Sequence, residues 1–272
     1  MNRIANYHGH LYLCKHATGD FEDYIQKAIK ENLKIIGFSD HVPYNDELST
    51  LLNSRRMSED EFYQIYLPSI EEMKNKYKDQ ITVLGAFEIE YYPELRTELL
   101  RLSSYVDYCI LGQHEICFNG QYKSVYDKNF NDDDIKLYGE MVVEALQTKV
   151  FKILAHPDIY MFNHPEFNEI AKETALKIIK ACDELGVYME INANGIRRCI
   201  MKDQDYQDES MYKYPNPKFW DIVSTYQKNH PTLKIIINDD CHRVEFLNDC
   251  CTEQAYTFAR KHGLIVDQEI SF

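Results

Sequence analysis

The stretch KIIGFSDHVP, residues 34–43, carries the two features on which the fold assignment depends. Its first half is a short β-type run that is apolar on both faces, which is typical of a strand buried in a parallel sheet under helices. Its second half places Asp40 and His41 directly after that run. In α/β folds the loops at the carboxyl ends of the strands form the binding sites. The stretch therefore predicts a buried strand that delivers polar side chains to a site.

Similar strand-like runs recur along the chain and alternate with longer amphipathic stretches. They lie at residues 3–8, 34–39, 81–87, 105–112, 150–155, 187–191 and 233–238. Such alternation predicts an α/β fold. Seven strands could form an open doubly wound sheet, which gathers only the loops beside its switch point, or a barrel, which gathers all of them. Polar metal-type residues follow all seven runs, and this favours a closed or nearly closed barrel.

Capping patterns mark several helix ends. Ser58 with Glu61 forms a capping-box pattern, and Asn216-Pro217 reads as an N-cap followed by proline at the first helical position. Gly186 suits a helix C-terminus. No linker-like segment is evident, so we expect one domain over residues 1–272.

Composition limits the partners and the compartment. With 30 basic and 44 acidic residues, the formal net charge is −14, which disfavours binding to long nucleic acids. A small anionic substrate could still bind where metal ions create a local positive site. The chain has no apolar run near the roughly 20 residues that a membrane helix needs and no signal-peptide pattern. Its eight cysteines form no CxxC pair, so we expect free thiols and a cytoplasmic protein.

The residues after the strands are of the kinds that bind transition metals. Nine candidate ligands occupy these loops: His8, His10, His16, His41, Glu88, His114, His156, Asp240 and His242. Imidazole and carboxylate ligands suit Zn, Fe or Mn and poorly suit Ca or Mg. A catalytic ion takes about three protein ligands plus water, so nine ligands suit three divalent ions. We expect Cys14 and Cys241, which also lie on these loops, to be small filler residues.

The charge of such a centre indicates the substrate. Three divalent ions would exceed the negative charge of Glu88 and Asp240, and hydroxide with an anionic substrate would balance the excess. A phosphate monoester dianion fits this requirement. We therefore predict attack of a metal-bridging hydroxide on phosphorus, with the metals holding the non-bridging oxygens. Asp158 and Glu115 are candidates for protonating the leaving group, and each could instead orient a histidine.

Taken as an ordered set, the strand-end motifs resemble those of the PHP (polymerase and histidinol phosphatase) superfamily, most closely the histidinol-phosphatase branch. The motifs are YHGHLYLCKHATG at 7–19, GFSDHVP at 37–43, GAFEIEYYP at 85–93, LGQHE at 111–115, AHPD at 155–158, EINANGIRR at 190–198 and DDCH at 239–242. The resemblance implies a distorted (β/α)7 TIM-like barrel with a trinuclear metal centre at the C-terminal ends of the strands. It also implies hydrolysis of L-histidinol phosphate to L-histidinol and phosphate, a reaction of histidine biosynthesis.

The resemblance also divides the ligands among the ions. His8, His10, Glu88 and Asp240 would hold one ion; Glu88, His114 and His156 a second; and His16, His41 and His242 the third. Glu88 and Asp240 thus become central to catalysis. Arg197, together with Arg198, would bind the substrate phosphate. The sequence Asn192-Ala193-Asn194-Gly195 predicts a tight turn that would aim Arg197 at the site.

Two departures from the family pattern leave the substrate open. Asn238-Asp239 precede Asp240, where histidinol phosphatases often have Gly-Ser, and residues 199–215 match poorly until Tyr214-Pro215. A nucleotide or a phosphotyrosine substrate is therefore an alternative, as is a non-catalytic metal-binding domain. A metal-dependent amidohydrolase is a further alternative, but such sites typically use a bridging lysine, and only Lys15 lies near a strand end.

Overall fold

The computed structural model of the chain describes residues 3–44, 56–164 and 166–272. Its main sheet has seven parallel strands in the order β1-β2-β3-β4-β7-β8-β9. These are β1 (Ala5–Asn6), β2 (Ile35–Phe38), β3 (Thr82–Ile89), β4 (Tyr108–Leu111), β7 (Phe151–Leu154), β8 (Tyr188–Asn192) and β9 (Ile235–Asn238). Each lies within or overlaps one of the seven predicted runs, so the predicted strands are confirmed.

The first and last strands close the ring through a seam of bridging contacts. One parallel bridge joins Gly9 to Cys241, and the His10 amide donates to the Cys241 carbonyl over 2.9 Å. A buried ion pair links Arg3 Nη1 to Asp239 Oδ2 at 2.7 Å. The sheet is therefore a nearly closed barrel, which confirms the predicted distorted (β/α)7 fold.

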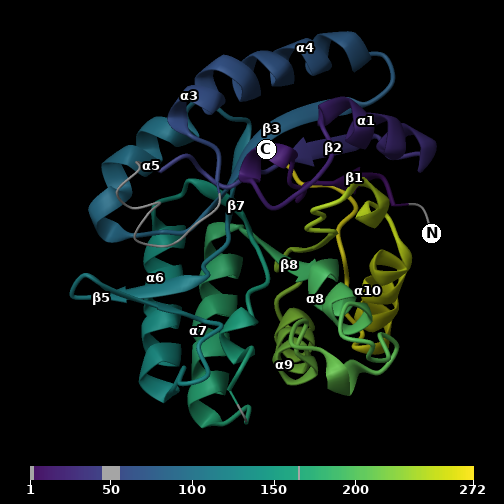
Figure 1. Ribbon diagram of the computed structural model, residues 1–272. Helices are drawn as coiled ribbons and strands as arrows, with labels where there is room; N and C mark the ends of the chain where they lie inside the picture. The colour runs from purple at the N-terminus through teal and green to yellow at the C-terminus, as the bar shows by residue number, and fades with distance from the viewer. Residues whose placement is uncertain (1–2, 45–55, 165) are drawn as a thin grey trace.

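Helices surround the strands on the outside (Figure 1). They are α1 (Phe21–Lys30), α3 (Glu59–Glu61), α4 (Leu67–Tyr77), α5 (Arg96–Ser103), α6 (Asp132–Gln147), α7 (Glu169–Leu185), α8 (Ala193–Ile200), α9 (Pro217–Gln227) and α10 (Cys250–Lys261). A π-helical turn, η2 (Phe62–Tyr66), joins α3 to α4. Short 3-10 turns are η1 (Tyr12–Cys14), η3 (Pro93–Leu95), η4 (Ile159–Met161), η5 (Glu209–Met211) and η6 (Val244–Phe246). Within the described ranges, no helix has both the length and the hydropathy needed to cross a bilayer.

Local capping explains where these helices begin and end. Ser58 and Glu61 form the predicted reciprocal capping box, and Asn216 caps the first turn of α9. Gly186 ends α7 with a φ of 68°, a left-handed conformation that glycine adopts without steric cost. These three predictions are confirmed. The predicted tight turn at residues 192–195 is wrong. Asn192 is instead the N-cap of α8, which begins at Ala193.

The interior of the barrel changes character along the strands. Side chains alternate between the two faces of a strand, so residues two apart share a face. On β3, Ala86 belongs to an apolar cluster inside the barrel, and Glu88 follows it on the same face. On β8, Tyr188 belongs to that cluster and Glu190 follows it. The interior is therefore apolar towards the amino ends of the strands and polar towards their carboxyl ends.

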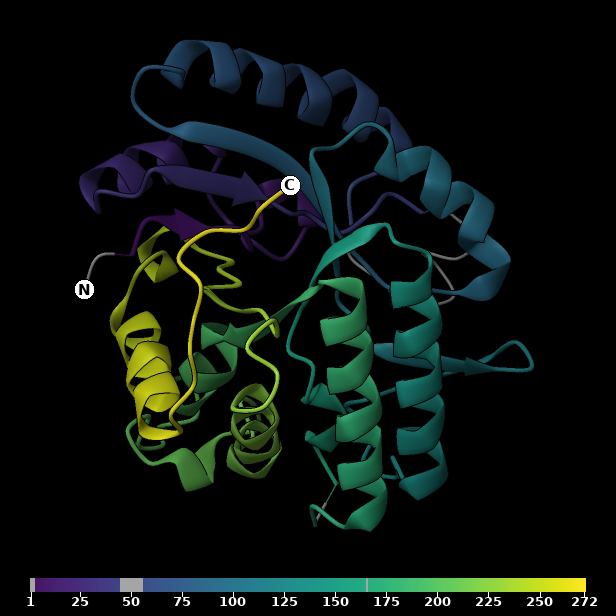
Figure 2. The ribbon, with the colours of Figure 1, turned by 180° about the vertical axis from the view of Figure 1, so that it is seen from behind.

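The C-terminal segment closes the amino end of the barrel. The Ile270 amide donates to the Tyr7 hydroxyl over 3.1 Å, and the Ser271 amide donates to the Tyr188 hydroxyl over 3.1 Å. The Phe272 ring lies 5.8 Å from the Tyr108 ring. Figure 2 shows this segment crossing from the last helix to the middle of the ring. Access to the polar end of the interior therefore comes from the carboxyl ends of the strands.

Candidate metal centre

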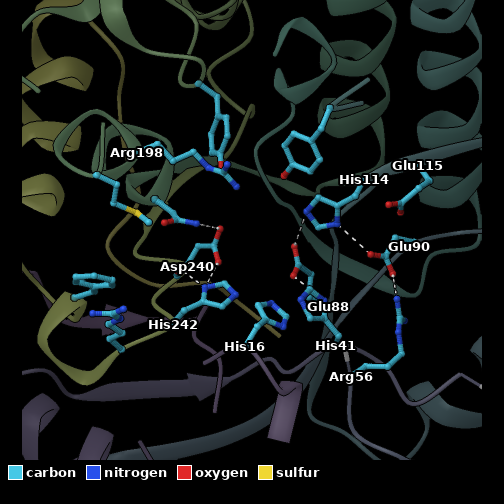
Figure 3. A pocket seen from close by; sticks show the side chains of 16 residues that line it. His16, His41, Arg56, Glu88, Glu90, His114, Glu115, Arg198, Asp240 and His242 are labelled. Atoms are coloured by element: carbon cyan, nitrogen blue, oxygen red, sulfur yellow. Dashed lines mark hydrogen bonds and ion pairs between the residues drawn. The ribbon is translucent and has the colours of Figure 1, made fainter. Parts of the chain in front are cut away.

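Glu88, near the end of β3, lies at the centre of a cluster of imidazoles (Figure 3). Its carboxylate oxygens lie 3.2 Å from His41 Nδ1, 3.3 Å from His156 Nε2 and 3.4 Å from His10 Nε2. His8 Nε2 is 3.5 Å away. The loops after three other strands thus meet around one carboxylate on β3.

A glycine directly after the next strand, β4, makes room for this carboxylate. A side chain at Gly112 would place its Cβ 2.1 Å from Glu88 Oε1. Because Glu88 is fixed by the surrounding imidazoles, it could not move aside without leaving the cluster. Gly112 is therefore required by close packing.

Asp240 forms a second acidic point in the cluster. Its Oδ1 lies 3.3 Å from His10 Nε2 and 3.4 Å from His242 Nδ1. Its Oδ2 accepts hydrogen bonds from the side-chain amides of Asn192, at 3.1 Å, and Asn194, at 3.2 Å. These amides fix the carboxylate so that Oδ1 points at the imidazoles.

Eight of the nine predicted ligands come together in three sets. The ligand atoms within each set lie within 4.8 Å of one another; the sets are His8-His10-Glu88, Glu88-His114-His156 and His16-His41-His242. Asp240 adjoins the first set through His10. Glu88 belongs to two of them, which is the bridging position that the resemblance implied.

A fourth set contains a thiol, namely His10, Cys14 and His242. Burial raises the pKa of Cys14 to about 12, which disfavours the thiolate form that a metal ligand must adopt. Cys241 is fully buried and burial also raises its pKa. Both placements agree with the predicted filler role.

The fit of this cluster to metal ions can be tested on its hydrogen bonds. Among the described residues, five buried imidazole nitrogens make no hydrogen bond: His8 Nε2, His10 Nδ1, His10 Nε2, His41 Nδ1 and His156 Nδ1. Buried polar atoms are nearly always bonded, and an unbonded one costs about 1–3 kcal/mol. Cations would give those nitrogens that face Glu88 and Asp240 a partner. The residues present therefore fit a group of divalent transition-metal ions.

Protonation also suits metal binding at several ligands. Burial, reinforced by the nearby His10, lowers the pKa of His242 to about 4. Burial likewise lowers the pKa of His41 well below its usual value. For Glu88, burial raises the pKa, but the charges of His8 and His41 outweigh it and bring it well below its usual value. Neutral imidazoles and an ionised carboxylate are the forms that bind metals.

Glu190 is a fully buried carboxylate that orients two ligands. It lies in the motif at residues 190–198, but the sequence predicted no role for it. Its oxygens lie 2.8 Å from His8 Nδ1 and 3.3 Å from the His156 amide. They also accept from Asn238 Nδ2 at 3.0 Å and Asn192 Nδ2 at 2.7 Å. Because Nδ1 of His8 donates to Glu190, its Nε2 is left as the acceptor that faces Glu88.

Glu90 orients another ligand, His114. Its Oε1 lies 3.0 Å from His114 Nδ1, and its Oε2 accepts from Arg56 Nη2 over 3.3 Å. Residues two apart in an extended segment share a face, so Glu90 faces the same side as Glu88. Burial lowers the pKa of His114, but the hydrogen bond to Glu90 and the charge of Glu88 raise it overall, to about 9.

Above the cluster lies a cavity of about 500 Å³ that the ligands share with other side chains. Arg198 lines it and is held by Tyr214, whose hydroxyl accepts from Arg198 Nε at 3.2 Å. The Arg198 guanidinium also lies 5.4 Å from the ring centroids of Tyr126 and Phe162. A fixed guanidinium beside a metal cluster can bind the oxygens of a phosphate group.

Arg197 does not occupy this position. Its Nε pairs with Asp249 at 2.8 Å, and its Nη1 and Nη2 donate to the carbonyls of Asp239 and Phe246. The side chain is almost fully buried and does not line the cavity. Consecutive residues of a helix point about 100° apart, so α8 sends Arg198 into the cavity and Arg197 into the seam beside β9. The predicted contact of Arg197 with phosphate does not fit this placement.

The two other polar candidates also differ in their placement. Asp158 accepts from the Asn216 amide and from Trp220 Nε1 and does not line the cavity, which leaves it no route to a leaving group. It makes no hydrogen bond to a histidine among the described residues. Glu115 lines the cavity, beside the ligand His114.

Known proteins resemble this chain in both sequence and fold. The PHP domain family matches residues 6–194. A histidinol-phosphatase of Bacillus subtilis is 22% identical over 70% of this chain and 81% of its own length. A probable histidinol-phosphatase of Schizosaccharomyces pombe is 27% identical over 68% and 67%. The histidinol phosphate phosphatase of Lactococcus lactis, crystallised with zinc, L-histidinol and phosphate, aligns over 99% of both chains with a TM-score of 0.70 and 16% identity.

Proposed function

Because this chain belongs to the PHP domain family, we propose that it is a metal-dependent phosphomonoesterase that hydrolyses L-histidinol phosphate to L-histidinol and phosphate. The observation that carries the proposal is the meeting of the predicted ligands in three sets around Glu88. The names of the two curated relatives support the reaction, and the Lactococcus lactis complex supports the substrate.

The three sets would hold three divalent ions, with Zn, Fe or Mn as the candidates. We propose His8, His10, Glu88 and Asp240 for one ion. Glu88, His114 and His156 would hold the second, and His16, His41 and His242 the third. When bound, such ions lower the pKa of water towards neutrality and neutralise charge on a phosphoryl group.

The protein's own groups position the substrate. Arg198 would donate to the non-bridging oxygens of the phosphate, where charge is spread as the P–O bond breaks. Its contacts with Tyr214, Tyr126 and Phe162 fix the guanidinium before the substrate arrives, so little side-chain entropy is lost on binding. Arg197 would act indirectly, by holding the seam beside β9.

A substrate panel with elemental analysis tests the proposal. Purified protein should contain about three transition-metal ions per chain and release phosphate fastest from L-histidinol phosphate. The panel should include nucleoside monophosphates and phosphotyrosine, which are the alternatives left open by residues 199–215. Full turnover after removal of all metal would contradict the mechanism, and a preference for another ester would replace the substrate. A complete metal set with no activity on any phosphoester would indicate a non-catalytic domain.

A further inference from the structure

We infer that Glu115 is the residue that selects the substrate, by binding a positively charged amino group on the alcohol part of the phosphate ester. This inference rests on the proposed phosphatase function and adds to it the residue that recognises the amino group of the substrate. It starts from the way in which charges are paired around the cavity.

Four carboxylates line the cavity in the described part of the chain: Glu88, Glu90, Glu115 and Asp240. Glu88 and Asp240 belong to the cluster of metal ligands. Glu90 is matched by Arg56 and His114. Glu115 has no ion-pair partner among the described residues, and its carboxylate accepts only a long hydrogen bond of 3.5 Å from the Tyr92 hydroxyl. One carboxylate in the cavity wall therefore lacks a cation.

The position of Glu115 suits the far end of a bound ester. Glu115 begins β5 (Glu115–Phe118), directly after the ligand His114. Figure 3 shows its side chain on the opposite side of the cavity from Arg198, with His114 between them. A phosphate that contacts the metal cluster and Arg198 would leave its alcohol part free to extend along the wall that holds Glu115. The positively charged amino group of the ligand would then face Glu115, and its phosphate would face Arg198.

Two other roles are possible for this side chain, and each makes a different prediction. As a general acid, Glu115 would protonate the leaving alkoxide of every substrate. As a partner of Tyr92, it would contribute only to stability. As a receptor for an ammonium group, it would affect only substrates that carry that group. An ester without the ammonium group would leave the Glu115 carboxylate unpaired in the closed site.

The test compares two esters that differ only in the amino group. These are L-histidinol phosphate and its deaminated analogue, 3-(imidazol-4-yl)propyl phosphate, assayed with metal-loaded wild type and Glu115→Gln. We expect Glu115→Gln to lower kcat/KM for L-histidinol phosphate by about 10- to 100-fold, mainly through KM, and for the analogue by less than about threefold. An equal loss on both esters would overturn the inference and favour the general acid.

Glu94→Gln is the matched control. Glu94 also accepts a hydrogen bond from a tyrosine, Tyr122, at 3.0 Å, but it does not line the cavity. This variant should treat both esters as wild type does. Thermal unfolding of all three proteins checks that the glutamine substitutions leave the fold intact.

A binding measurement separates this inference from the proposed reaction. Calorimetry of L-histidinol with metal-loaded protein should show weaker binding to Glu115→Gln than to wild type, by about tenfold or more. Equal binding would overturn the role of Glu115 even if the enzyme is a phosphatase. Conversely, wild type that binds L-histidinol through Glu115 but hydrolyses neither ester would contradict the proposed function and leave the amino-group site in place.

Discussion

The two ends of the barrel bury polar groups in opposite ways. At the amino end, the hydroxyls of Tyr7 and Tyr188 accept hydrogen bonds from the amides of Ile270 and Ser271. These hydroxyls therefore find partners in the C-terminal segment. At the carboxyl end, imidazole nitrogens of His8, His10, His41 and His156 stay without hydrogen bonds among the described residues. Tyr7 and Tyr188 at one end and His8, His10 and His156 at the other are all buried. The functional end is therefore distinguished by buried imidazole nitrogens that lack a partner among the described residues.

The difference predicts how variants at the two ends should behave. Changes at the carboxyl end should affect metal content and turnover more than folding, because the cluster is built for a ligand. Changes at the amino end should affect stability and leave turnover intact, because its hydrogen bonds are complete within the chain.

Glu88→Gln should have the largest effect. The amide would keep the size of the side chain but remove the charge that two of the ligand sets share. We expect kcat to fall by at least about 1,000-fold, since the loss affects more than one ion. Phosphate release and elemental analysis measure the result. Retention of the wild-type rate with a full metal content would refute the bridging role.

The adjacent arginines on α8 should separate stability from binding. Arg197→Ala would leave Asp249 unpaired and two carbonyls without donors, so we expect a loss of about 3–5 kcal/mol in the free energy of unfolding. Arg198→Ala should raise KM about 10- to 100-fold with little change in stability. Urea unfolding and steady-state kinetics distinguish the two. If Arg197→Ala instead folded normally and lost phosphate affinity, the roles assigned here would be reversed.

Glu190→Gln should weaken metal binding. A glutamine amide would place a donor against groups that already donate to this position, and it would release His8 from its present orientation. Loss of such a partner typically lowers metal affinity by about 10- to 100-fold. Competition with a chelator measures the affinity, and circular dichroism of the metal-free protein serves as the control for folding. An unchanged affinity would show that His8 is oriented without Glu190.

Tyr7→Phe tests the amino end and should have the smallest effect. The Ile270 amide would lose its acceptor, at a cost of about 1 kcal/mol, or roughly 2–4 °C in Tm for a chain of this size. Activity and metal content should match wild type. A loss of turnover without a loss of stability would mean that the two ends are coupled.

Much of the architecture could be predicted from local sequence signals. The seven strands of the barrel were recognisable because each is a short run that is apolar on both faces. The hairpin of β5 with β6 (Gln121–Ser124) was missed because its strands are short and partly exposed. Residues 192–195 were assigned to a turn because Asn and Gly favour turns. The side-chain oxygen of Asn192, which could stabilise a turn, instead caps helix α8. The prediction of one domain in the cytoplasm remains a prediction.

By itself, the sequence determined the alternation of strands and helices and the identity of the side chains at each strand end, because both depend on neighbouring residues. Only the tertiary structure decided which of those side chains meet and which are already occupied. His8 finds its orienting carboxylate 182 positions away in Glu190, and Arg197 finds Asp249 52 positions away. Such pairings follow from barrel closure and from which way each side chain points, and no local pattern encodes them.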